Sequence, residues 1–331
     1  MLKEKDVIGF LNGRDFAVLL GVLLLIASVV AALLGNVQVP VGGNGVFFPA
    51  FHQLIPNPLL SWAVNLAAIG GVCVLLLLLQ KMHTFIRSYT SIFVSAFLIL
   101  QIASPMLCVR LFGGTLMCLL VISMVSLMFA CYQDKDSQRS VFAIFASISA
   151  CAMFQYSFLF LLPVFFVGFV QMRAMNLRSA LAAILGIITP YWIVAPTMMF
   201  FGAMPLDWSA INAPQLQNLW SINPADLQLH SIILWVATLA LAIVLSALNM
   251  LHLINYNLQT RSCNGFFVVL TFATAAMMCI DFRNISFYLP ILNMCIAIQI
   301  AHSFTINKSE KRYIPILILI ALALTSYSLN F

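Results

Sequence analysis

The chain has 331 residues, of which 63% are hydrophobic and only 7% are charged. Soluble domains carry roughly 25% charged residues, so this composition excludes a soluble globular protein, a disordered chain and a nucleic-acid-binding domain. The formal net charge of +6 says little about partners, because membrane proteins concentrate Lys and Arg in their cytoplasmic segments. We therefore predict an all-α, polytopic membrane bundle that forms a single domain over residues 1–331.

Apolar segments recur along the whole chain, and a helix needs about 20 such residues to cross the hydrocarbon of a bilayer. The first is longer than the roughly 7–15-residue apolar core of a signal peptide, which favours a membrane helix. The fifth and sixth are short, but "MFQYSF" between them and the following Pro163 favour a turn. About eleven spans are predicted, at 16–35, 59–80, 89–108, 111–132, 141–154, 157–172, 179–201, 231–249, 265–280, 286–304 and 313–330.

The positions of the basic residues test this count. With the N-terminus in the cytoplasm and the C-terminus outside, all 15 Lys and Arg residues except Arg110 and Arg283 fall in cytoplasmic segments. Merging the fifth and sixth spans would move Arg173 and Arg178 to the outside. The preference of Lys and Arg for the cytoplasmic side therefore supports eleven spans in a multi-pass protein of the cell membrane. The expected location is a bacterial inner membrane.

Two long loops lie on the predicted outer side. The first, residues 36–58, has no Asp or Glu. Its Gly and Pro residues exclude a long helix, and its aromatic stretch suits the membrane interface. The second loop, residues 203–230, is expected to hold short helical pieces. It contains two acids, a histidine and two tryptophans, namely Asp207, Asp226, His230, Trp208 and Trp220.

The outer side also carries the two basic residues that oppose the general bias. Arg110 and Arg283 either make local contacts, Arg283 with Asp281, or hold an anion such as a lipid phosphate, which the planar guanidinium matches well. The tryptophans form either an interfacial belt or the aromatic lining of a sugar site. The candidate substrate-binding residues are Arg110, Arg283, His52, Trp208, Trp220, Tyr156 and Tyr288. The candidate catalytic residues are Asp207, Asp226, Asp281 and His230, because carboxylates and histidine act as general bases near neutral pH.

Other signals of chemistry are weak. No predicted span has an Asp, Glu, Lys or Arg in its middle, which weighs against an ion-coupled pump. The chain lacks the motifs of phosphate-binding loops, zinc proteases, serine hydrolases and dinucleotide sites. Its cysteines show no metal-like spacing, so we predict no cofactor and no metal, and take the cysteines as packing residues. Small residues one helical turn apart, such as Ala182 and Gly186, are typical of close helix packing.

Residues 147–202 resemble part of the GT-C superfamily of membrane glycosyltransferases. The likeness consists of a small-residue segment, a proline-containing span, a basic inner loop and a span with a proline next to aromatic residues. The corresponding positions are Ala150, Ala152, Pro163, Arg173, Arg178, Pro190, Tyr191 and Trp192. The long outer loops after the first and seventh spans also resemble those of GT-C enzymes.

The resemblance implies an enzyme of envelope glycan or glycolipid assembly that uses a polyprenyl-phosphate-linked sugar at the outer leaflet. In such an enzyme Arg110 and Arg283 would hold the phosphate and an outer aspartate would act as base. GT-C enzymes usually place an acid in the first outer loop, and this chain has none there, so that role would pass to Asp207, Asp226 or Asp281. Two alternatives stay open, namely a lipid or glycan translocator and a non-catalytic membrane subunit that docks a protein partner.

Overall fold

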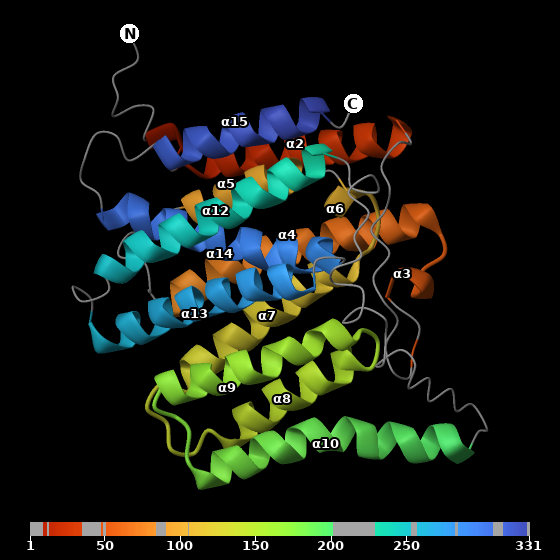
Figure 1. The fold of residues 1–331 in the computed structure, drawn as a ribbon, viewed down its shortest axis with the longest axis vertical. Helices are drawn as coiled ribbons and strands as arrows, with labels where there is room; N and C mark the ends of the chain where they lie inside the picture. Colours follow the sequence, from red (N-terminus) through yellow and green to blue (C-terminus); the bar gives the residue numbers. More distant parts are fainter. Residues whose placement is uncertain are drawn as a thin grey trace.

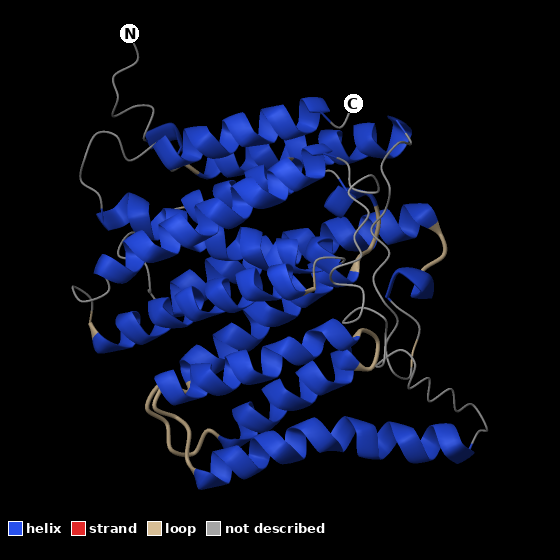
Figure 2. Ribbon diagram, in the orientation of Figure 1, coloured by secondary structure: helices blue, strands red, loops and turns tan. Residues whose placement is uncertain are grey.

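The computed structural model describes residues 9–11, 13–34, 48, 51–83, 91–104, 106–200, 229–252, 257–281, 284–306 and 314–329. Within these ranges every regular element is a helix and no strand occurs (Figure 2). Helices satisfy their own backbone N–H and C=O groups, which is why long apolar segments adopt this conformation in lipid. The predicted all-α class is confirmed.

The helices follow the predicted spans closely, usually within three residues at each end. Their bounds are α2 (Arg14–Leu34), α3 (Phe51–Leu54), α4 (Pro58–His83), α5 (Ile92–Ile102), α6 (Met106–Val109), α7 (Gly113–Ala130), α8 (Gln138–Ala152), the 3-10 helix η1 (Tyr156–Phe160), α9 (Leu161–Gln171), α10 (Leu177–Phe200), α12 (Leu229–His252), α13 (Leu258–Ile280), α14 (Ile285–Ile306) and α15 (Ile314–Leu329).

Local sequence explains where helices depart from the predicted spans. The segment 89–108 is divided into α5 and the short α6, because Pro105 lacks an N–H and disfavours a helical conformation of Ser104 before it. Helix α13 begins at Leu258 rather than at residue 265, since its polar first turns continue the helix beyond the apolar run. A turn separates α8 from η1, as "MFQYSF" predicted.

The long helices lie side by side and alternate in direction, so their ends gather on two sides of the bundle (Figure 1). One side, here called the basic end, holds the described basic residues Arg14, Lys81, Lys135, Arg139, Arg173, Arg178 and Arg261. The other side, here called the Asp281 end, holds the α13–α14 junction, the start of η1 and the start of α7. Among the described residues, Arg110 is the one basic side chain at the Asp281 end.

Seven of the described helices are long and apolar enough to cross a membrane, namely α2, α4, α7, α10, α12, α13 and α14. Four further apolar helical segments are shorter: Ile92–Ile102, Gln138–Ala152, Tyr156–Gln171 and Pro315–Thr325. Large apolar side chains of α10, such as Leu181, Ile188 and Trp192, are exposed on its surface. A bilayer would cover such surfaces, so the chain is a membrane-embedded helical protein.

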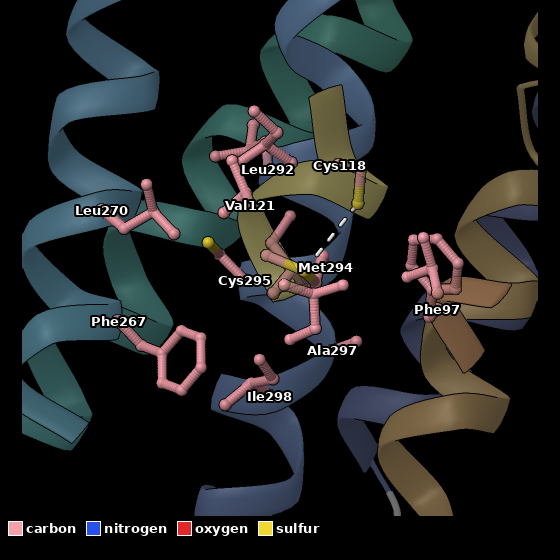
Figure 3. Packing of buried hydrophobic residues seen from close by; sticks show 14 of the residues in the cluster. Phe97, Cys118, Val121, Phe267, Leu270, Leu292, Met294, Cys295, Ala297 and Ile298 are labelled. Carbon is pink, nitrogen blue, oxygen red and sulfur yellow. Dashed lines mark hydrogen bonds between the residues drawn. The ribbon is translucent and has the colours of Figure 1, made fainter. Parts of the chain in front are cut away.

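Helix α14 forms the centre of the bundle and is almost entirely buried. It packs against α5, α7, α12 and α13. Figure 3 shows its inner contacts, where the Cys118 thiol of α7 lies 3.8 Å from the Met294 sulfur and donates to the Pro290 carbonyl at 3.5 Å. All eight cysteines are free thiols, of which five are buried and Cys279 is exposed.

A buried polar network joins α14 to α12 and α13. The Gln299 amide donates to Ser246 Oγ at 3.0 Å and to Thr271 Oγ1 at 3.2 Å. Asn249 donates to the Gln299 carbonyl oxygen at 3.0 Å and also to its side-chain oxygen. The network satisfies polar groups inside an apolar bundle, and hydrogen bonds of this kind hold membrane helices together.

We expect Gln299→Leu to lower the stability of the bundle by about 1–3 kcal/mol, because its polar neighbours Asn249 and Ser246 would lose a buried partner. Asn293→Leu is the matched substitution on the same helix and should act in the opposite direction. The Asn293 side chain is 0% exposed, and neither of its polar atoms has a partner among the described residues. Thermal unfolding in one detergent would compare the two variants, and a destabilised Asn293→Leu would contradict this assignment.

Candidate functional site at the α13–α14 junction

Three residues proposed from the sequence meet at the Asp281 end. Asp281 ends α13, Tyr288 lies in the first turn of α14, and Tyr156 begins η1. The Tyr288 hydroxyl donates to Asp281 Oδ2 at 2.9 Å. The Asn284 amide donates to both Asp281 oxygens at 3.0 Å and to the Tyr156 hydroxyl at 2.9 Å. The result is one connected polar group of four side chains from three elements.

The chain reversal between α13 and α14 positions the carboxylate. The Asp281 N–H donates to the Met277 carbonyl at 2.8 Å and so ends α13. The Asn284 N–H donates to the Asp281 carbonyl at 3.0 Å, which closes the turn into α14. Asp281 is half-buried, and Tyr288 is 0% exposed. The carboxylate is therefore fixed by buried neighbours while part of the side chain stays accessible.

The hydrogen bonds leave the carboxylate with unused capacity. An ionised carboxylate has about four acceptor positions. Oδ2 accepts from Asn284 and Tyr288, whereas Oδ1 accepts from Asn284. Asp281 can thus accept a further hydrogen bond, or a proton, from a bound molecule.

Two more polar side chains lie beside this group. Gln155 is 2% exposed and Ser157 is 3% exposed. The Gln155 amide nitrogen has no hydrogen-bond partner among the described residues, whereas the Ser157 hydroxyl lies against the hydroxyls of Tyr156 and Tyr288 and interacts with both. Buried polar groups are nearly always satisfied in native proteins. Ser157 therefore belongs to the polar group of the two tyrosines, and Gln155, on the other side of Tyr156 in the chain, adds an unused hydrogen-bond donor.

Aromatic rings surround the polar group. Phe287 and Tyr288 meet edge to face at 5.7 Å, and Phe158 meets Phe287 at 5.6 Å. Helix α3 joins this cluster, since the Phe51 ring stacks on Phe154 at 4.9 Å and contacts Phe158 at 6.2 Å. Rings arranged this way exclude water on one side of the site and strengthen its electrostatic interactions.

The other sequence candidates are only partly placed. Arg110 is exposed in the turn between α6 and α7, at the same end of the bundle. His52 and His230 belong to α3 and α12, but their side chains lie outside the described part of the structure. Arg283, Asp207, Asp226, Trp208 and Trp220 fall outside the described residues altogether.

Three members of the site, Asn284, Gln155 and Ser157, were not among the residues predicted from the sequence. The short separation of Asp281, Asn284 and Tyr288 in the sequence was an available signal, because the three residues follow one another through a single chain reversal, from the end of α13 to the first turn of α14. The Gln155 and Ser157 side chains carried no such pattern. Their place depends on the packing of η1 against α14, which no local pattern encodes.

The described residues contain no group of three or more His, Cys, Asp or Glu side chains that could hold a metal ion. Comparison of the chain with protein-family models, with curated proteins and with solved structures finds no match.

Proposed function

We propose that the chain is a GT-C-like membrane protein of envelope glycan or glycolipid assembly, with a polyprenyl-phosphate-linked sugar handled at the Asp281 end. The observation that carries this proposal is the hydrogen-bonded Asp281, the one described acid at that end, in a polar group that includes the Tyr156 and Tyr288 hydroxyls and the Asn284 amide. A positioned carboxylate next to hydroxyl and amide groups suits the recognition and activation of a sugar hydroxyl.

The proposed orientation places the Asp281 end outside a bacterial inner membrane and the basic end in the cytoplasm. The clustering of described Lys and Arg residues at the basic end supports it, because cytoplasmic segments attract these residues. The proposal includes eleven spans. The seven long helices would then be joined by α5, α8, α15 and the η1–α9 pair, which run between the same two sides of the bundle (Figure 1).

The chemical step follows from this arrangement. A hydroxyl oxygen of the acceptor attacks the anomeric carbon of the lipid-linked sugar, and the bond from that carbon to the phosphate oxygen breaks. The lipid phosphate leaves with the bonding electron pair, and Asp281 takes the proton of the attacking hydroxyl. Asn284 and Tyr288 hold the carboxylate in place, so that orientation and general base catalysis both contribute.

Sidedness is tested by chemical labelling in a cysteine-free background. Arg110→Cys and Lys135→Cys each place one thiol at an exposed position, at opposite ends of the bundle. A membrane-impermeant maleimide added to intact cells should label position 110, and should label position 135 only after the cells are permeabilised. The reverse pattern would overturn the proposed orientation.

Turnover tests the activity itself. The purified protein in nanodiscs should release polyprenyl phosphate from at least one member of a panel of polyprenyl-phosphate-linked hexoses, as followed by mass spectrometry. Turnover that survives removal of the Asp281 carboxylate would remove the catalytic role from this site.

A non-catalytic membrane subunit is the second candidate. It is favoured by the local origin of the hydrogen bonds to Asp281, because Asn284 lies in the turn after it and Tyr288 in the first turn of the following helix. The same bonds would serve a purely structural junction between α13 and α14. In that case Asp281→Asn would lower the unfolding temperature, and no lipid-linked sugar would be consumed.

A further inference from the structure

Two turns at the basic end are joined to each other. One connects α7 to α8 and the other connects α9 to α10; with the residues next to them, 131–139 and 172–179, they are here called the turn pair. The hydrogen bonds between them run from the Gln133 N–H to the Met172 carbonyl at 3.0 Å, from the Ser137 hydroxyl to the Ala174 carbonyl at 3.0 Å, and from the Asn176 amide to the Lys135 carbonyl at 2.8 Å. The turn pair is therefore one surface built from two distant parts of the sequence.

Each turn contains a residue in the left-handed conformation that is not a glycine. Gln133 has a φ of 59° and Arg173 a φ of 56°, and no other non-glycine residue in the described part of the chain has a positive φ. The Arg173 N–H donates to the Val170 carbonyl at 3.0 Å. The Ala174 N–H donates to the Phe169 carbonyl at 3.1 Å, which completes a Schellman motif at the end of α9. Arginine thus stands where this motif usually has glycine, because a β-carbon disfavours the left-handed conformation.

Four exposed cations gather on the turn pair, namely Lys135, Arg139, Arg173 and Arg178. Each lies within two residues of a hydrogen bond that crosses between the two turns. None of them forms an ion pair with an acid in the described part of the chain. The turn pair also contains two exposed aspartates, so four cations against two carboxylates give it a net charge of +2. Such a surface attracts anions.

Exposed apolar side chains adjoin the two arginines. Val170 of α9 lies three residues before Arg173. Leu177 of α10 precedes Arg178, and Leu181 follows it by three residues, one helical turn further into the bundle. In Figure 1, α8 lies between α9 and α10 at one edge of the bundle. A cationic surface that continues into an exposed apolar one matches a phospholipid, which carries its phosphate at the membrane surface and its acyl chains below.

We propose that the turn pair binds an anionic phospholipid, with Arg173 and Arg178 as ligands of its phosphate and its acyl chains along α9 and α10. The planar guanidinium group matches phosphate oxygens. The preference of basic residues for one side of a membrane accounts for cations in these turns, but any position in a turn would satisfy it. It does not account for an arginine at a position that suits glycine. The lipid site lies at the basic end, away from Asp281, and does not depend on the proposed function.

Native mass spectrometry of the full chain in detergent measures the dissociation constants of added dioleoyl phosphatidylglycerol and dioleoyl phosphatidylcholine. The wild-type protein should bind phosphatidylglycerol more tightly. Arg173→Gly and Arg178→Gln should each weaken phosphatidylglycerol binding about 5-fold, since one basic residue near an anionic lipid surface contributes about this factor. Both variants should leave phosphatidylcholine binding unchanged. Wild-type affinity for phosphatidylglycerol in the double variant would overturn the site.

The second left-handed residue provides a matched control. Gln133→Gly and Arg173→Gly both place glycine at a left-handed position, so each should raise the unfolding temperature by about 1–3 °C. Only Arg173→Gly should weaken phosphatidylglycerol binding, and an equal loss in Gln133→Gly would assign the effect to turn geometry and overturn the role of the arginine. Arg14→Gln removes an exposed cation from α2, at the opposite edge of the bundle (Figure 1). It should leave binding unchanged, and an equal loss there would overturn a site confined to the turn pair.

Two competitors test whether the occupant is a lipid. Glycerol 3-phosphate shares the phosphate of phosphatidylglycerol but has no acyl chains, and polyglutamate represents an acidic protein segment. Neither should displace phosphatidylglycerol at equal concentration, because neither has acyl chains to cover the exposed apolar side chains of α9 and α10. Displacement by glycerol 3-phosphate or by polyglutamate that requires Arg173 would overturn the lipid assignment, in favour of a free phosphate or of an acidic protein partner.

Discussion

Asp281→Asn is expected to slow the release of polyprenyl phosphate from a lipid-linked sugar by about 10²–10⁴-fold, the usual contribution of a positioned general base. Asparagine has nearly the same size as aspartate, and its side-chain oxygen can still accept from Asn284 or Tyr288. It cannot take the proton of the acceptor hydroxyl. The measurement is the initial rate of lipid phosphate release in nanodiscs, quantified by mass spectrometry at saturating lipid-linked sugar.

Two companion variants make this experiment decisive. Asp134→Asn removes a carboxylate at the basic end and should leave the rate unchanged. Tyr288→Phe removes one donor to Asp281 but keeps the carboxylate, so we expect a smaller loss of about 10-fold, the value of one hydrogen bond to a charged group. Wild-type rates in Asp281→Asn, with an unchanged unfolding temperature, would exclude the catalytic role.

The positions of the helices could be predicted because length and hydropathy act locally. An apolar run of about 20 residues has few alternatives to a helix in lipid, and α4 and α10 lie within a few residues of their predicted spans. The turn before η1 was predictable from "MFQYSF". The division of α5 from α6 was missed, although Pro105 was visible in the sequence. The segment 89–108 is apolar throughout, so hydropathy alone predicted one continuous helix. The break between α5 and α6 depends instead on the missing N–H of Pro105.

Individual residues of the site could be predicted from the sequence, but their proximity to one another could not. Asp281, Tyr156 and Tyr288 stood out as polar or aromatic residues at predicted outer ends. No sequence pattern indicated that they meet, since Asn284 and Tyr156 are 128 positions apart and approach only when η1 packs beside α14.

The packing of α10 on α8 gives a second prediction, this time on stability. α10 packs mainly against α8 and exposes most of its remaining surface. At Gly186 a β-carbon would lie 2.7 Å from the Phe142 carbonyl oxygen and 3.1 Å from the Ala146 backbone nitrogen. One step further along, Ser149 Oγ donates to the Ile187 carbonyl at 2.6 Å. The small residue therefore sets the distance between the two helices.

Gly186→Leu should separate α8 from α10 and lower the unfolding free energy by about 1–3 kcal/mol or more, because the nearest atoms belong to the backbone of α8 and cannot rotate away. Gly70→Leu is the matched control, since a β-carbon at Gly70 meets nothing within 4 Å. That change should be neutral or stabilising by up to about 1 kcal/mol, the difference in helix propensity between glycine and good helix formers. Thermal unfolding in a single detergent compares the Gly186→Leu and Gly70→Leu variants. Equal unfolding temperatures would show that the close contact at Gly186 does not stabilise the packing of α10 on α8.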